Sequence, residues 1–167
     1  MPTRLVIVSD THVPQRARAI PTPLWRAMEE ADVVVHAGDW NGIALLDEIE
    51  ARVARLVAVR GNNDGPEFDD RLPEVASIEL DGIALAVLHD SGPAERREAR
   101  MEARFPDADV LVFGHSHIPW DTTTPRGLRL LNPGSPTDKR RQPTGSYLLV
   151  TADEGVLRDV ELVPIER

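Results

Sequence analysis

The sequence contains no cysteine among its 167 residues. This absence excludes disulfides, zinc–thiolate sites and thiol nucleophiles together. Long apolar runs are absent as well. The N-terminal run, Leu5–Val8, is too short for a signal peptide, and no stretch approaches the roughly 20 residues that a membrane helix needs. We therefore expect a cytoplasmic protein that makes no use of a membrane.

Basic side chains are the minority, with 19 against 28 acidic ones and a formal net charge of −9. Such a surface repels a nucleic-acid backbone, so we expect no stable nucleic-acid binding. It would also repel a substrate phosphate unless a local positive charge, such as a bound metal ion, receives it. The length and the composition, 41% hydrophobic and 28% charged, are typical of one globular domain.

The first half of the chain alternates apolar strands with amphipathic helices. We predict strands at residues 4–9, 32–37 and 55–60, and helices at 24–31 and 42–53. This order implies parallel strands in one sheet, joined by right-handed crossovers.

The second half changes character. We predict a hairpin of strands 75–80 and 83–89 around Asp81-Gly82, a helix at 93–105 and a buried strand at 109–114, then short strands at 128–131, 146–151 and 156–162. The expected fold class is α/β, with two sheets packed together and helices outside.

Polar side chains follow five of the predicted strands, at the point where each strand ends. They are Asp10-Thr11-His12, Gly38-Asp39, Gly61-Asn62-Asn63-Asp64, His89-Asp90 and Gly114-His115-Ser116-His117. In open α/β sheets, ligands bind at the carboxyl ends of strands, so the five segments are expected to converge. Carboxylate, imidazole and amide oxygen are ligands for divalent transition metals.

Local geometry supports joint ligation. Read as extended strand ends, Asp-x-His and His-x-His place alternate side chains on the same side. The glycines before Asp39, Asn62 and His115 allow tight turns behind the ligands.

Taken singly, each segment has an ordinary explanation. Asp10 could cap a helix or start a turn, residues 61–64 read as a turn, and residues 114–117 as a polar turn with hydrogen-bonded histidines. Together they contain four of the five histidines, which favours one shared metal site. The fifth, His36, is expected to be a buried histidine rather than a ligand.

The order of these motifs, followed by Asn132-Pro133-Gly134-Ser135, resembles the calcineurin-like metallophosphoesterase superfamily from about Leu5 to Ser135. The short form looks like its small bacterial and archaeal phosphodiesterase branch, to which the retromer scaffold subunit of eukaryotes is related. The resemblance implies an αββα sandwich of two mixed β-sheets flanked by helices. We expect a single metallophosphoesterase domain at residues 1–167, and a homodimer would be in keeping with the branch.

The resemblance also implies a site for two divalent metal ions. One ion would take Asp10, His12 and His117, the other Asn62, His89 and His115, and Asp39 would bridge both. Mn²⁺ is the expected metal, with Ni²⁺, Fe²⁺, Co²⁺ and Zn²⁺ as alternatives.

The expected activity is that of a phosphoesterase, more specifically a phosphodiesterase. A water or hydroxide between the ions would attack a small-molecule phosphoester. The residues expected to act in catalysis are Asp39, Asn63 and Asp64. The alternative is a non-catalytic, protein-binding scaffold on the same fold, against which the retained Asp10 and His12 argue.

Two departures from the family pattern bear on mechanism. Asn63 stands where many members have histidine, and an amide can donate a hydrogen bond but cannot transfer a proton. This favours diesters over monoesters. Asp90 stands where glycine is common, and could support a histidine ligand or repel substrate. The basic segment Lys139–Arg141 could anchor a phosphate or form a plain surface loop.

Overall fold

The computed structural model describes residues 1–166. The first half forms β1 (Thr3–Val8), α1 (Thr22–Glu30), β2 (Val33–His36), α2 (Ile43–Arg52), β3 (Leu56–Ala58) and the 3-10 helix η1 (Pro66–Phe68). The second half forms β4 (Val75–Leu80), β5 (Ile83–Leu88), α3 (Arg97–Arg104), β6 (Val110–Val112), β7 (Trp120–Thr123), β8 (Arg129–Asn132), β9 (Gly145–Asp153) and β10 (Val156–Ile165).

The first sheet has the strand order β10-β9-β1-β2-β3. Its strands β1, β2 and β3 are parallel, with Val6 beside Val34 and Val34 beside Leu56, while β9 runs antiparallel to β1. The four residues Leu5–Val8 are all buried because α1 and α2 pack on one face of the sheet and the second sheet packs on the other. The unbroken apolar run of β1 is thus explained by burial on both faces.

The second sheet has the order β4-β5-β6-β8-β7. Strands β5, β6 and β8 are parallel, and β4 and β7 are antiparallel strands at the edges. The hairpin between β4 and β5 turns at Asp81 and Gly82, whose positive φ angles of 47° and 80° are those that a two-residue hairpin turn requires. Met101 of α3 packs on the outer face of this sheet.

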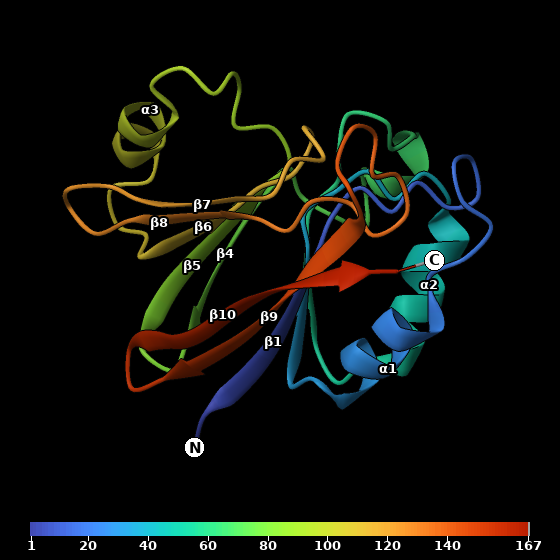
Figure 1. The fold of residues 1–167 in the computed structure, drawn as a ribbon, viewed down its shortest axis with the longest axis horizontal. Helices are drawn as coiled ribbons and strands as arrows, with labels where there is room; N and C mark the ends of the chain where they lie inside the picture. The colour runs from blue at the N-terminus through green and yellow to red at the C-terminus, as the bar shows by residue number, and fades with distance from the viewer. Residues whose placement is uncertain (167) are drawn as a thin grey trace.

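The inner faces of the two sheets meet in one apolar core, where Ile7 and Val35 of the first sheet lie with Val87 and Val112 of the second. Figure 1 shows α1 and α2 outside the first sheet and α3 outside the second. The predicted αββα sandwich of two mixed sheets is therefore confirmed.

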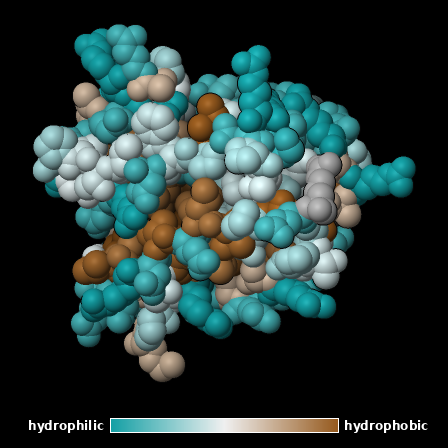
Figure 2. Space-filling model, viewed as in Figure 1, coloured by the Kyte–Doolittle hydropathy of each residue, from teal (hydrophilic) through white to brown (hydrophobic). Residues whose placement is uncertain are grey.

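The surface gives two further observations. Within residues 1–166, no helix is long and apolar enough to cross a membrane. Figure 2 shows a hydrophobic area beside β10 on a face that is otherwise mostly hydrophilic. Val156 and Leu162 of this edge strand are among the exposed large hydrophobic residues.

Two sequence-based expectations for the second half were wrong. The helix expected from residue 93 begins only at Arg97, because Arg96 adopts a left-handed backbone with φ of 50°. The preceding loop is held instead by Arg100, whose guanidinium donates to the carbonyls of Ser91, Pro93 and Glu95. Strand β7 was not predicted, since its residues are largely polar and it pairs only with β8.

Candidate metal centre

The seven predicted ligands lie at one end of the sandwich, on the loops that leave β1, β2, β3, β5 and β6. Backbone hydrogen bonds join these loops within each sheet: Asp10 N–H donates to Gly38 O (2.9 Å), and Gly114 N–H to His89 O (2.9 Å). Side chains that are far apart in the sequence therefore meet where the two sheets meet.

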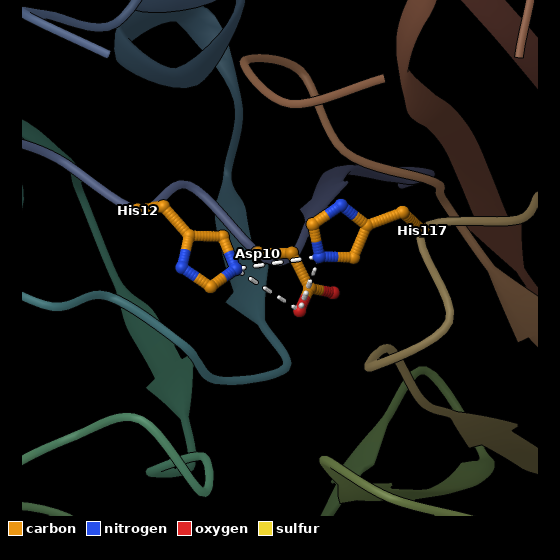
Figure 3. A group of neighbouring side chains, drawn as sticks. All are labelled: Asp10, His12 and His117. Carbon is orange, nitrogen blue, oxygen red and sulfur yellow. Dashed lines mark hydrogen bonds and ion pairs between the residues drawn. The ribbon is translucent and has the colours of Figure 1, made fainter. Parts of the chain in front are cut away.

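The most enclosed group consists of Asp10, His12 and His117, each at most 1% exposed. The Nε2 atom of His117 lies 3.4 Å from Asp10 Oδ1, that of His12 lies 3.7 Å from the same oxygen, and the two Nε2 atoms are 3.3 Å apart. Figure 3 shows the two rings and the carboxylate pointing toward one another, Asp10 and His12 from the loop after β1 and His117 from the loop after β6. Three ligand atoms thus face one small volume.

Asp39 and His89 lie directly beside this group. Asp39 Oδ2 is 3.6 Å from His12 Nε2, and Asp39 Oδ1 is 3.3 Å from His89 Nε2. One carboxylate therefore faces a histidine of each predicted site. Asp10 Oδ1 is also 3.8 Å from His89 Nε2, so Asp10 too lies between the two groups of ligand atoms.

The remaining predicted ligands form the open side of the centre. His115 Nδ1 lies 3.2 Å from Asn62 Oδ1, and the rings of His115 and His89 meet edge to face with centroids 5.2 Å apart. The side chain of His115 is 44% exposed, and its Nε2 is 3.8 Å from the exposed carboxylate of Asp90. One half of the centre is thus buried, and the other half faces solvent.

The backbone of the ligand loops is left-handed rather than extended, which corrects the expectation for Asp-x-His and His-x-His. Positive φ angles occur at Asp10 (57°), His12 (46°), Asp39 (61°), His115 (73°) and His117 (62°). Each such residue costs on the order of 1–3 kcal/mol and persists only where its surroundings enforce it. The sharp turns bring the side chains together within one loop, where extended chain would have carried them away from the sheet.

Close approach explains two of the glycines. A Cβ at Gly114 would lie 2.0 Å from Ser9 Oγ and 2.6 Å from Asp10 Oδ2. A Cβ at Gly61 would lie 2.1 Å from Asp39 Oδ1. Any side chain at either position would displace a carboxylate of the centre.

The chemistry of the enclosed atoms fits a cation. Asp10 Oδ1 and His89 Nε2 are buried and have no hydrogen-bond partner among the described residues. Burial alone would raise the pKa of Asp10, but His117 and His12 hold it well below its usual range. Burial would likewise lower the pKa of His89, but Asp39 and Asp10 raise it to about 9. The carboxylates thus draw positive charge to this point, and a divalent cation would supply it.

Two of the histidines are oriented by backbone carbonyls. His89 Nδ1 lies 2.8 Å from Ala37 O, and His117 Nδ1 lies 2.7 Å from Asp138 O. A hydrogen bond donated by Nδ1 leaves Nε2 facing the carboxylates, the arrangement by which proteins fix histidine as a metal ligand.

Asn63 and Asp64 contact Asp39 and its turn. Asn63 donates from its backbone N–H to Asp39 Oδ1 (3.0 Å) and from Nδ2 to Oδ2 (2.8 Å). The carboxylate of Asp64 accepts four backbone N–H groups, from Gly61 and from the three consecutive residues 39–41, at 2.7–3.0 Å. Asp64 thereby fastens the loop after β3 to the loop after β2.

Two residues that hold the loop after β1 in place were not predicted from the sequence. Ser135 Oγ donates to Asp10 O (2.7 Å), and Thr137 Oγ1 donates to Thr11 O (2.5 Å). Both follow Asn132-Pro133-Gly134, a segment that contributes to the family resemblance but does not by itself indicate this role. The two hydroxyl residues after this turn were the signal in the sequence that could have indicated their role.

His36 is fully buried, as expected. Its ring stacks on Trp40 with centroids 3.6 Å apart, its Nδ1 accepts a hydrogen bond from Gly38 N–H (3.1 Å), and its Nε2 lies 3.1 Å from Thr11 Oγ1. Both ring nitrogens are therefore engaged, and His36 supports the ligand loops from behind.

Comparison with known proteins agrees with this fold. A family model of the calcineurin-like phosphoesterase superfamily domain matches residues 3–155. A probable metallophosphoesterase of Methanocaldococcus jannaschii is 31% identical over 163 residues, covering 96% of this chain and 80% of the relative. A phosphodiesterase of the same organism is 25% identical over 127 residues, covering 68% and 73%.

Solved structures include Vps29, the retromer subunit, of Entamoeba histolytica in complex with zinc. It superimposes with a TM-score of 0.77 at 22% identity, covering 97% of this chain and 98% of Vps29, a likeness of fold. The sandwich and the Asp/His cluster are features of the metallophosphoesterase class. This chain belongs to the calcineurin-like phosphoesterase superfamily.

Asp64→Asn should lower the free energy of unfolding of the metal-free protein by about 2–4 kcal/mol, because hydrogen bonds to a charged acceptor are lost. Urea unfolding measures the change. Asp70→Asn is the matched control, since Asp70 is exposed, and should shift stability by less than about 0.5 kcal/mol. Equal effects of the two substitutions would contradict the fastening role of Asp64.

The stability of the metal-free protein should depend on pH through His36. Burial lowers the pKa of His36 to about 3 from an ordinary 6.5, so protonation favours the unfolded state. This contribution is complete above pH 6.5 and is lost as the pH falls toward 3. His36→Gln should remove about one proton, roughly 1.4 kcal/mol per pH unit, from the slope in this window. Urea unfolding with chelator at several pH values measures it, and unchanged slopes would rule His36 out.

Proposed function

We propose that this protein is a metal-dependent phosphodiesterase that works with two divalent ions. The observation that carries the proposal is the convergence of buried ligand atoms, including Asp10 Oδ1 and His89 Nε2, that lack any hydrogen-bond partner within residues 1–166. A buried polar atom without a hydrogen-bond partner lowers the stability of the folded protein. A bound ion at this point would supply the missing partner.

The proposed ligand sets follow the two groups of side chains. One ion would be held by Asp10, His12 and His117, whose atoms enclose a buried point. The other would be held by Asn62, His89 and His115, nearer to solvent. Asp39 would bridge them, in keeping with its oxygens at 3.6 Å from His12 and 3.3 Å from His89.

When bound, the ions would acidify a water between them and neutralise charge on the phosphoryl oxygens. The residues of this chain do the positioning. Asn63 donates a hydrogen bond to each oxygen of Asp39 and so fixes the orientation of the carboxylate. Asp64 holds the backbone of the same turn, and Ser135 and Thr137 hold the backbone of Asp10 and Thr11. We assign Asp39 and Asn63 to the catalytic machinery and Asp64 to its support.

Diesters are the preferred substrate class in this proposal. The amide of Asn63 cannot give a proton to a leaving alcohol, so the best substrates are esters whose leaving group needs little protonation. The phosphodiesterase of M. jannaschii supports the same class. A net charge of −9 favours a small molecule over a nucleic-acid strand.

Mn²⁺ is the proposed metal, and Ni²⁺, Fe²⁺, Co²⁺ and Zn²⁺ are the alternatives, because mixed carboxylate and imidazole ligands accept all of them. We assign this activity to a single domain that spans the chain. The likeness to Vps29 concerns fold, so no specific observation favours the alternative of a non-catalytic scaffold.

Asp39→Asn should abolish the hydrolysis of bis-p-nitrophenyl phosphate in Mn²⁺, by more than about 100-fold, since even outer partners of metal ligands cost 10–100-fold. Steady-state absorbance assays measure the rate, and circular dichroism checks the fold. Asp70→Asn is the exposed control and should retain activity.

Two results would refute the proposed function. One is a wild-type protein without turnover on diesters and monoesters in any of the five metals. The other is an Asp39→Asn variant that keeps the wild-type rate.

A further inference from the structure

A basic loop leads away from the buried side of the centre. Asp138 O accepts the hydrogen bond of His117 Nδ1 (2.7 Å), and the next three residues are Lys139, Arg140 and Arg141. All three are exposed, and none lies within ion-pair distance of a carboxylate in the described part of the chain. The segment of three cations thus begins one residue from a group that orients a proposed ligand, and Arg140 also acts electrostatically on the carboxylate of Asp138.

The loop has a defined shape. Gln142 N–H donates to Lys139 O (2.9 Å), which closes a turn over the three cations, and Lys139 Nζ donates to Gln142 O (3.2 Å). Arg140 stands in this turn with a left-handed φ of 49°. The turn therefore presents its charges on an ordered backbone.

A second loop joins it from the other side. Arg16 N–H donates to His12 O (2.8 Å), and Arg16 Nη1 lies 2.6 Å from Asp138 Oδ2. The loops after β1 and β8 thus meet beside His12 and His117. We call Arg16, Arg140 and Arg141 the basic rim; Asp138 is the carboxylate that lies among them, and Lys139 lines a separate groove with Ile165 and Glu166. In Figure 2, the surface over the loop between β8 and β9 is hydrophilic.

The opposite side of the centre has no such excess. The groove beside His89 is lined by Arg60 and Arg104 but also by Glu74 and Asp90. Arg60 is already paired, with Glu74 at 3.3 Å and with Asp69 at 3.4 Å. Asp90 adds an exposed negative charge next to His115. Positive charge is therefore concentrated on one side of the metal centre.

The excess of positive charge on this side of the centre is larger than the binding of a simple phosphodiester requires. A phosphodiester carries one negative charge, which the ions themselves would neutralise. On a chain of net charge −9, further anionic groups would be repelled unless cations are placed to receive them. We propose that the basic rim binds a second phosphate group on the substrate, so that the substrate class is a small phosphodiester with an additional phosphate, such as a phosphorylated nucleoside. This inference rests on the proposed function for the site of cleavage.

Calorimetry on the Mn²⁺-loaded protein measures the binding of a second phosphate to the basic rim without any hydrolysis. Thymidine 3′,5′-bisphosphate should bind about tenfold more tightly than thymidine 5′-monophosphate at low salt, and the gap should shrink as salt screens exposed charges. Arg140→Gln with Arg141→Gln should remove the preference for the bisphosphate, and Arg140→Lys with Arg141→Lys should keep it. Arg26→Gln with Arg55→Gln is the charge-matched control, because both arginines are exposed and lie away from the rim.

Turnover separates this inference from the proposed function. Thymidine 5′-(p-nitrophenyl phosphate) and its 3′-phosphate differ only in the additional group, and the preference should appear in KM rather than kcat. If both esters react and bind equally well, the rim proposal fails while the function stands. If neither reacts but the bisphosphate preference persists and depends on Arg140 and Arg141, the rim stands while the function fails. Tighter binding of a long oligothymidylate would overturn the small-molecule assignment.

Discussion

The structure depends on two buried carboxylates that face the same point. Asp10 and Asp39 offer oxygens within 4.8 Å of each other and of His89 Nε2, and both side chains are almost fully removed from water. Like charges at this distance repel, and each has lost its hydration, so the arrangement is favourable only when positive charge lies between them. In the metal-free protein His89 provides it, because Asp39 and Asp10 raise the pKa of its imidazole to about 9 against the effect of burial. Folding of this end of the sandwich and binding of a cation are therefore linked, and the metal that fills the site also stabilises the loops that form it.

The loops in turn hold a strained backbone that no single segment could maintain. Five candidate ligands are left-handed, and the bonds that enforce this come from elsewhere in the chain. Asp64, on the loop after β3, holds the turn that carries Asp39. Ser135 reaches back over 125 residues to the carbonyl of Asp10. Because Asp10 and Asp39 belong to the first sheet while His89 and His117 belong to the second, the centre exists only when the two sheets are packed together.

The parts of this arrangement that are local in sequence could be predicted. Continuous apolar runs such as Leu5–Val8 predicted the buried strands, and the polar motif after each run predicted that the ligands lie close together. What could not be predicted depends on contacts between distant loops. Three of the four backbone donors to Asp64, those of residues 39–41, lie on the loop after β2 and reach it only when the loops after β2 and β3 are adjacent. The delayed start of α3 at Arg97 likewise follows from the guanidinium of Arg100 binding loop carbonyls, which competes with helix formation.

The environment of Asn63 limits the chemistry further than its amide alone suggests. Its backbone N–H and its Nδ2 both donate to Asp39, so the side chain is engaged before a substrate arrives. His36 is a neutral imidazole near pH 7, because burial lowers its pKa to about 3, and its ring stacks on Trp40. The half of the centre at Asn62 and His115 is open to solvent. The proposed preference for diesters with leaving groups of low basicity rests on the amide of Asn63, which cannot transfer a proton.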